Sequence, residues 1–393
     1  MRDPDVDRLK AAYNLATKEC KRAYLRADAQ RVARFGQELI SHPTGSRSYW
    51  RLAKAVQSNF CQPSLPPLKC PDGTLAHQPQ EKAELLANLF AANSRIDDLG
   101  MRPPTIPYCG VTMPDIRIRQ CDVRAELRSL DVRKASGPDG IPAVILKKCA
   151  AELSPALTRL YCLSYSSGVV PESWREANVI PIPKKGDRSD PHNYRPIAVT
   201  SVLCKVLERI INRQLVRYLE DHSLISDRQY GFRPKRSTGD LLAYVTHLWG
   251  EAMDRHGESL AISLDITKAF DRVWYRSLLS KLPAYGLPPR LCSWVAAFLH
   301  ERQFRVLCDG RASGFVQVNA GVPQGSVLSP TLFLLHINDM LSLGNIHCYA
   351  DDSTVHGRYH GHPAAKQAAV SENRQVLVTE LDQALNRISV WGS

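Results

Sequence analysis

The sequence lacks the features that mark secreted, membrane-spanning and zinc-binding proteins. Its eleven cysteines include no Cys-x-x-Cys pair and no Cys/His cluster with zinc spacing. No apolar segment near the start has the form of a signal peptide, and no apolar run is long enough to span a bilayer. Internal repeats and low-complexity tracts are also missing. These absences predict an intracellular protein, nuclear or cytoplasmic, that has no contact with membranes.

What the chain has in excess is positive charge. Lysine and arginine number 51 against 39 acidic residues, so the formal net charge is +12, which suits a polyanionic partner. Residues 1–60 hold twelve basic and six acidic residues, and therefore half of this excess. A solvated helix face explains any single one of these residues equally well. With 393 residues, 44% of them hydrophobic, the chain is long enough for two or three domains.

Two adjacent carboxylates, Asp351 and Asp352, lie between two short apolar runs. Residues 346–348 precede Tyr349-Ala350 and residues 353–355 follow the acids, a pattern that predicts a strand, a turn and a second strand. A turn of this kind exposes its carboxylates to a metal ion. An ordinary turn explains the pair alone equally well, because Asp bonds its own backbone.

A second acid ends a predicted strand further upstream. Large apolar residues at positions 260, 262 and 264 alternate with small or polar ones, and the run ends at Asp265. Divalent cations such as Mg²⁺ take oxygen ligands, typically one or two carboxylates together with substrate phosphates and water. Asp265 and Asp351 on neighbouring strands meet that requirement. Asp271, by contrast, is predicted to be a helix N-terminal residue and not a ligand.

Five further motifs accompany the two acid segments. They are Lys134-Ala135-Ser136-Gly137-Pro138-Asp139-Gly140-Ile141-Pro142, residues 179–185, Asn193-Tyr194-Arg195-Pro196-Ile197, Gly231-Phe232-Arg233 with Arg236-Ser237-Thr238, and Gly321-Val322-Pro323-Gln324-Gly325-Ser326 with Leu328-Ser329-Pro330. In this order and spacing the chain resembles the reverse transcriptases of LINE-type retrotransposons, the jockey-like elements that lack long terminal repeats. The resemblance extends over residues 49–392.

The resemblance implies an α+β fold, the right-hand polymerase arrangement of fingers and a ferredoxin-like palm. It implies a basic, mostly helical N-terminal extension with a Pro-rich linker over residues 1–114, fingers with part of the palm over residues 115–255, and the rest of the palm over residues 256–393. We expect the last palm strand and the thumb to be absent, which would make the chain a fragment of a longer polyprotein or the product of a truncated element.

The chemistry that the resemblance implies is RNA-directed DNA polymerisation by two metal ions. Asp265, Asp351 and Asp352 would be the catalytic metal ligands, for two Mg²⁺ ions or alternatively Mn²⁺. The partners would be template RNA, a DNA primer and deoxynucleoside triphosphates, with no small-molecule cofactor. A catalytically silent remnant that only binds nucleic acid is the alternative, and for it we expect weak, salt-sensitive binding without processive extension.

Nucleotide-binding residues follow from the same resemblance. Lys184 and Arg195, in a predicted hairpin, would meet the triphosphate. Phe270 would lie under the sugar and exclude a 2′-hydroxyl, while Gln324 would lie along the nascent base pair and Ile266 beside the nucleotide. The alternatives are a solvated turn lysine, with Lys185 able to exchange roles with Lys184, core packing for the phenylalanine and a loop without a ligand for the glutamine.

Template contacts are predicted for Gly137, Arg233, Arg236 and Gly325. A bland loop at a helix entry is the alternative for Gly137. Guanidinium groups beside a helix N-terminus favour phosphates, and the helix over residues 238–249 that follows the arginines has Ser237 or Thr238 as its natural N-cap. Helices are also predicted over residues 1–40, 49–56, 80–95, 143–165 and 372–391, and from Ser329 onward. Prolines between residues 179 and 185 predict an edge strand there.

Overall fold

The computed structural model describes residues 4–41, 64–98, 100–362 and 367–392, and the chain divides into two units. The first unit, Met1–Leu65, holds helix α1 (Pro4–Ser41), as predicted for residues 1–40. The helix predicted over residues 49–56 lies outside the described residues. The second unit, Pro66–Ser393, holds every other described element.

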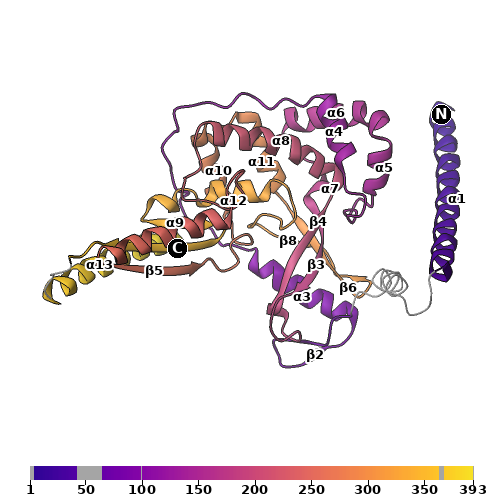
Figure 1. The fold of residues 1–393 in the computed structure, drawn as a ribbon. Helices are drawn as coiled ribbons and strands as arrows, with labels where there is room; N and C mark the ends of the chain where they lie inside the picture. Colours follow the sequence, from indigo (N-terminus) through magenta and orange to yellow (C-terminus); the bar gives the residue numbers. More distant parts are fainter. Residues whose placement is uncertain (1–3, 42–63, 99, 363–366, 393) are drawn as a thin grey trace. The chain divides into compact units, whose positions relative to one another are not determined.

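The second unit mixes helices and strands (Figure 1). Its helices are α3 (Pro79–Asn93), α4 (Gln120–Ser129), α5 (Ala143–Lys148), α6 (Ala150–Ser167), α7 (Glu172–Arg175), α8 (Val202–Asp221), α9 (Thr238–Asp254), α10 (Tyr275–Lys281), α11 (Pro289–Leu299), α12 (Ser329–Ile337) and α13 (Gln367–Gly392), with the 3-10 turns η1 (Pro191–Asn193), η2 (Leu282–Tyr285) and η3 (Met340–Ser342). Its strands are β1 (Leu68–Lys69), β2 (Leu75–Ala76), β3 (Glu176–Pro183), β4 (Tyr194–Thr200), β5 (Glu258–Asp265), β6 (Gln303–Cys308), β7 (Arg311–Ala312), β8 (Val316–Gln317), β9 (Ile346–Tyr349) and β10 (Asp352–Tyr359). The predicted α+β class is confirmed.

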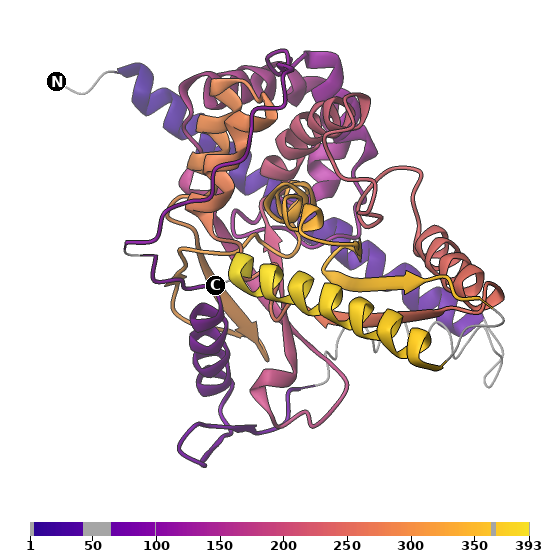
Figure 2. The same ribbon diagram turned by 90° about the vertical axis from the view of Figure 1, so that its left-hand side faces the viewer.

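A three-stranded antiparallel sheet has the order β5-β10-β9. Helix α13 lies along one face of it (Figure 2). The alternation predicted for β5 explains why, since residues 260, 262 and 264 pack with Val355 of β10 against Leu377 and Leu381 of α13. On the opposite face, α9 covers the end far from the acids, where Arg358 donates to the Leu248 carbonyl at 3.1 Å. The end of this face that carries Asp265 stays exposed.

A second sheet has the order β4-β3-β6-β7, with β8 also paired to β6. The prediction that β3 is an edge strand is wrong for its first half, because residues 176–179 pair in parallel with β6. Pro181 and Pro183 lie beyond that ladder, where β3 pairs only with β4. The rule that prolines occupy edge positions therefore holds for this part of the strand, because here β3 has a hydrogen-bonded neighbour on one side only among the described strands.

The main hydrophobic core is formed mostly by residues of helices α4 to α8 and α10 to α12. Large side chains such as Tyr161, Trp294, Phe298 and Phe333 are almost fully buried in it. The helix predicted over residues 143–165 is present but interrupted at Cys149, so it forms α5 and α6. The helices predicted over residues 80–95, 238–249 and 372–391, and from Ser329 onward, correspond to α3, α9, α13 and α12.

The N-terminal extension predicted over residues 1–114 divides between the two units, because the first unit ends at Leu65. Strands β1 and β2 and helix α3 belong to the second unit, and α3 packs beside β6 (Figure 1). The Pro-rich stretch over residues 101–114 contains no helix or strand, as its composition indicates. None of the helices in the described ranges is long and apolar enough to cross a membrane.

Candidate active site

Asp351 lies in a two-residue turn between β9 and β10. Tyr349 pairs with Asp352 across the hairpin, so Ala350 and Asp351 form the turn itself. Ala350 has φ +60°, a left-handed backbone conformation that costs free energy for most residues with a Cβ and is adopted more readily by Gly, Asn and Asp. Such backbone strain is typical of functional positions. The predicted strand-turn-strand with carboxylates at its tip is present.

Strand β5 brings a third carboxylate to this tip. Asp265, the last residue of β5, is the direct cross-strand partner of Asp352. Directly opposite residues in an antiparallel pair have Cα atoms about 4.5–5.5 Å apart and point to the same face. Asp265 and Asp352 are both exposed, whereas Asp351 is half-buried. The three acids therefore meet at one end of the three-stranded sheet.

Electrostatics couples these acids. Burial raises the pKa of Asp351, and the negative charges of Asp352 and Asp265 raise it further, while Arg195 has the opposite effect. The shift means that the ionised form of Asp351 costs free energy in this environment. A positive charge near the turn would relieve that cost.

The acids provide the hard oxygen donors that Mg²⁺ prefers. In the arrangement seen, however, no group of three or more His, Cys, Asp or Glu side chains within the described ranges is close enough to hold a metal ion. The side chains of Asp265 and Asp352 are exposed to solvent on this face, which leaves them room to rotate. The donor set thus fits a divalent cation, although the carboxylates are not gathered around one point.

The β3–β4 hairpin carries the basic residues predicted to meet a triphosphate. Lys184 is exposed just past β3, and its ammonium donates to the His192 carbonyl at 3.4 Å. Arg195 is exposed on β4, opposite Ile182, and its charge acts on Asp351. Lys184 acts electrostatically on Asp271 instead. The hairpin therefore turns positive charge toward the acid end of the other sheet.

The Gln324–Gly325 loop docks against β4. The Ala198 amide donates to the Gln324 carbonyl at 2.8 Å. Gly325 has φ +137°, and a Cβ at this position would lie 2.2 Å from the Ala198 carbonyl oxygen. Only glycine satisfies both conditions. The side chain of Gln324 donates to Asp271 at 2.9 Å and is thereby held beside the turn that follows β5. The prediction that Asp271 is a helix N-terminal residue is wrong, because Asp271 lies in this turn, four residues before α10 begins.

Two acids that sequence reasoning did not identify as functional organise this loop. Burial raises the pKa of Asp271, whose carboxylate accepts the Gln324 bond. Glu208 of α8 is fully buried, and its carboxylate accepts from the Ser326 hydroxyl and from the amides of Val327 and Leu328, at 2.7 and 3.1 Å. Glu208 thus satisfies amides at the entry of α12. Neither role has a local sequence signal.

Phe270 and Ile266 follow β5 and line the core side of the acid end. The Phe270 ring stacks on Phe333 with centroids 4.5 Å apart and meets Phe232 edge-on at 5.9 Å. Phe270 is half-buried, and Phe232 is 50% exposed. Ile266 is half-buried and touches both hydrophobic clusters. Core packing therefore accounts for part of both side chains.

Gly137 packs against the start of α8. A Cβ there would lie 2.6 Å from the Ser201 amide nitrogen, and Asp139 in the same loop accepts from the Ser201 hydroxyl at 2.6 Å. The helix-entry loop is thus fastened to the β4–α8 junction. Its glycine is required by this contact alone, independently of the template contact predicted for it.

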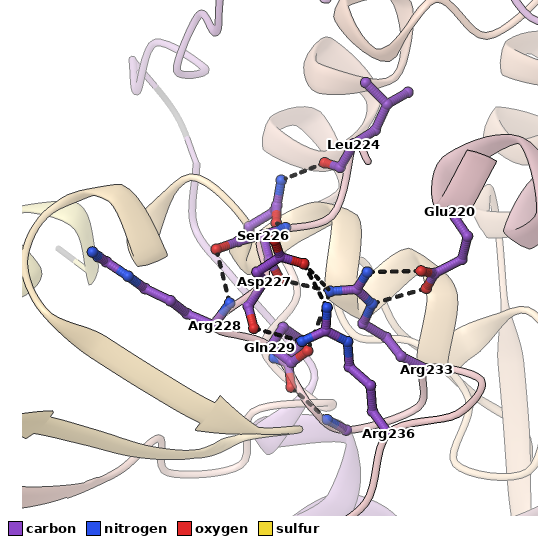
Figure 3. Close-up of polar contacts among 10 residues, drawn as sticks. Glu220, Leu224, Ser226, Asp227, Arg228, Gln229, Arg233 and Arg236 are labelled. Carbon is purple, nitrogen blue, oxygen red and sulfur yellow. Dashed lines mark hydrogen bonds and ion pairs between the residues drawn. The ribbon is translucent and has the colours of Figure 1, made fainter. Parts of the chain in front are cut away.

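Arg233 and Arg236 are engaged with the protein itself (Figure 3). Arg233 is 8% exposed and forms a bidentate pair with Glu220 at 2.8 and 2.7 Å, while its third guanidinium nitrogen donates to the Ser226 carbonyl at 2.7 Å. Arg236 pairs with Asp227 and donates to its carbonyl at 2.7 Å. A template contact by Arg233 would require these bonds to be given up. Ser237 caps α9, as predicted, and Asp240 completes a capping box with it.

Comparisons with known proteins point in one direction. The family model described as reverse transcriptase (RNA-dependent DNA polymerase) matches residues 182–388. The RNA-directed DNA polymerase from mobile element jockey of Drosophila melanogaster is 29% identical over 330 residues, which are 81% of this chain and 35% of that protein. Its namesake from Drosophila funebris is 30% identical over 334 residues, covering 78% and 35%.

A third relative is the Pol polyprotein from the type-1 retrotransposable element R1 of Bradysia coprophila, 27% identical over 360 residues that cover 86% of this chain and 34% of that protein. The chain spans about a third of the length of the curated relatives it matches. The matched region includes every acid of the candidate site.

Proposed function

Because the chain belongs to the reverse transcriptase (RNA-dependent DNA polymerase) family, we propose that it is the polymerase core of a LINE-type retrotransposon and copies RNA into DNA. The sequence resemblance to jockey-like enzymes is confirmed by the relatives that match over most of its length. The observation that supports the activity most is the pairing of Asp265 with Asp352 beside the Asp351 turn.

Within this proposal the two larger sheets have different tasks. The β5-β10-β9 sheet with α13 is the palm, which presents the acids on its exposed end. The β3–β4 hairpin is the fingers flap, which carries Lys184 and Arg195. The charge of Arg195 acting on Asp351 supports the idea that flap and palm face one reaction centre.

Asp265, Asp351 and Asp352 would hold two Mg²⁺ ions. The chemistry that Mg²⁺ supplies to such a site is a lowered pKa for the attacking 3′-hydroxyl and neutralisation of charge on the departing pyrophosphate. The aspartates fix where that positive charge lies, and the half-buried position of Asp351 keeps one ligand partly shielded from water. No side-chain nucleophile is required.

The neighbouring residues bind and orient the substrates. Lys184 and Arg195 donate charge-assisted hydrogen bonds to the triphosphate. Phe270, backed by the stacked Phe333 ring, supports the sugar, while Ile266 and Gln324 border the incoming nucleotide. The bond from Gln324 to Asp271 supports this assignment, because it limits the rotation of the amide.

Template RNA and a DNA primer complete the proposed reaction. Gly137 and Gly325 are assigned to the template side by the family resemblance, although the space that their missing side chains leave is taken by the backbone of Ser201 and Ala198. Arg236 retains partial exposure beside the N-terminus of α9. Arg233 is assigned to the template side as well, with its ion pair to Glu220 as the interaction that competes.

Single-nucleotide addition by the purified 393-residue chain tests the proposal. A 5′-labelled DNA primer on an RNA template is incubated with one complementary deoxynucleotide and Mg²⁺ at high protein concentration, so that weak binding is not limiting. We expect primer extension by one nucleotide, lost on Asp351→Asn. Asp382→Asn, which alters an exposed carboxylate on α13, on the other face of the sheet from Asp265, is the control and should retain addition.

Two results contradict the proposal in different ways. Addition that survives both Asp265→Asn and Asp351→Asn would exclude these acids as the catalytic centre. Salt-dependent binding of RNA and DNA without any addition would instead favour the alternative, a nucleic-acid-binding remnant whose affinity comes from counterion release. Measuring both activities on the same preparation separates the two functions.

A further inference from the structure

We infer that Gln229 is a positioning residue for the acid turn: its side-chain amide fixes the backbone of Ala350 and thereby the direction in which Asp351 points. The inference rests on the proposed function, since the turn matters for catalysis only if Asp351 holds a metal ion. The hydrogen bonds that carry it are independent of that function.

One side chain satisfies both backbone groups of Ala350. The Gln229 carbonyl oxygen accepts from the Ala350 amide at 2.9 Å, and its NH₂ group donates to the Ala350 carbonyl at 3.2 Å. The same carbonyl oxygen also accepts from the Gly231 amide at 2.8 Å. Gln229 is 1% exposed. The peptide planes on both sides of Ala350 are therefore held at once.

The conformation of the turn explains why such a clamp is needed. Ala350 has a left-handed backbone, φ +60°, which costs about 1–2 kcal/mol for an L-residue with a Cβ. A residue in such a conformation persists where surrounding contacts over-determine it. Asp351 is the next residue in the chain. Release of Ala350 into a relaxed conformation would therefore rotate the Asp351 carboxylate away from its neighbours.

Gln229 is itself locked beside strand β9. The Tyr230 amide donates to the Cys348 carbonyl and the Cys348 amide donates to the Arg228 carbonyl, each at 2.8 Å, so residues 228–230 extend the sheet in parallel. Gly231 completes the contact, because a Cβ on it would lie 2.2 Å from the Ala350 nitrogen. The backbone of Gln229 is thus fixed beside β9, and from this position its side chain reaches the turn.

The two arginines form the outer frame of the clamp (Figure 3). Arg233 donates to the backbone carbonyl of Gln229 at 3.4 Å while it is paired with Glu220. Arg236 holds Asp227, two residues before Gln229. The segment from Ser226 to Arg236 thus holds Gln229 in place, and Gln229 in turn holds the acid turn at Ala350. Arg233 therefore contributes to the site through Gln229, in addition to the proposed contact with the template strand.

Metal binding by the full 393-residue chain tests the inference. Mn²⁺ affinity is measured by electron paramagnetic resonance at pH 7, and Asp351→Asn defines the binding that depends on the acid turn. Gln229→Met keeps the length and burial of the side chain and removes its three hydrogen bonds. We expect Gln229→Met to weaken the Asp351-dependent affinity about 10- to 100-fold, the range found when groups that orient metal ligands are lost.

Gln214 provides a matched control. Its side-chain amide clamps Arg117 in the same way, accepting from the backbone amide and donating to the backbone carbonyl at 3.0 Å each, but these bonds join α8 to the segment before α4 and involve none of the strands that carry the acids. Gln214→Met should leave Mn²⁺ affinity within about twofold of the unaltered chain, a change of ~0.4 kcal/mol. Equal effects of the two variants would overturn the inference, because a general loss of stability would then explain both.

Hydrogen–deuterium exchange of the unaltered chain tests the clamp without any variant. At single-residue resolution, the amides of Ala350 and Gly231 should exchange at least tenfold more slowly than exposed turn amides. Unprotected exchange at both positions would overturn the clamp even if Mn²⁺ binds. Protected amides in a chain with no Asp351-dependent Mn²⁺ binding would instead contradict the proposed polymerase site, and with it the positioning role.

Discussion

Replacement of Phe270 by alanine separates a role in substrate selection from a role in packing. The ring lies between Phe333, on which it stacks, and Phe232, which meets it edge-on. If Phe270 supports the sugar of the incoming nucleotide, its removal opens space for a 2′-hydroxyl. If it is core alone, only stability changes.

The two effects have different expected sizes. Truncation of a fully buried phenylalanine costs about 3–5 kcal/mol, and Phe270 is half-buried, so we expect a loss of about 2–3 kcal/mol in the free energy of unfolding. Loss of the steric block should raise the ratio of ribonucleotide to deoxynucleotide incorporation about tenfold or more, equivalent to ~1.4 kcal/mol of transition-state discrimination. A packing role alone predicts no change in that ratio.

Phe298→Ala is the matched control. Phe298 is 1% exposed and also stacks on an aromatic ring, that of Trp294 at 5.5 Å, within the helical core. Incorporation ratios are measured with single nucleotides, and unfolding free energies with urea, for both variants. A ratio that rises equally in the two variants, or in neither, would refute the assignment of Phe270 to sugar selection.

Two further predictions concern pH and the docked loop. Burial lowers the pKa of His347 to about 4, below its unfolded value of about 6.5. Its contribution to stability is therefore present above pH 6.5 and lost as the pH falls toward 4. In a plot of the urea unfolding midpoint against pH, His347→Gln should flatten the curve between these two pH values. Gly325→Ala should cost about 1–3 kcal/mol in unfolding free energy, because its Cβ meets the Ala198 carbonyl, whereas Gly314→Ala, which meets nothing within 4 Å, should be neutral.

The elements around the acids could be predicted because their signals are local. Alternation along β5 identifies its buried face and delivers Asp265 to its end. The N-cap Ser237 and the first-turn proline Pro330 mark where α9 and α12 begin. The prolines of β3 gave a partly wrong answer, since no local pattern states that its first residues pair with β6, more than a hundred residues later.

The support of the site could not be predicted for a related reason. Glu208 and Ser326 are 118 residues apart, and Gln229 and Ala350 are 121 apart. Nothing in the neighbourhood of either partner indicates the pairing. Arg233 illustrates the opposite case, because a guanidinium beside a helix N-terminus reads as an anion site until the bidentate pair with Glu220 is seen.

The fastening of the Gln324 loop to β4 couples this loop to the β3–β4 hairpin. The Ala198 amide is bonded to the Gln324 carbonyl and Gly325 lies directly against the Ala198 carbonyl, so a movement of this part of β4 would disturb the loop. Under the proposed function, a closure that carried Arg195 toward a triphosphate would also displace the Gln324 amide, and through it Asp271. Recognition of the phosphates and of the base would thus occur in one concerted step, and a nucleotide that fits only one of the two would leave the hairpin open.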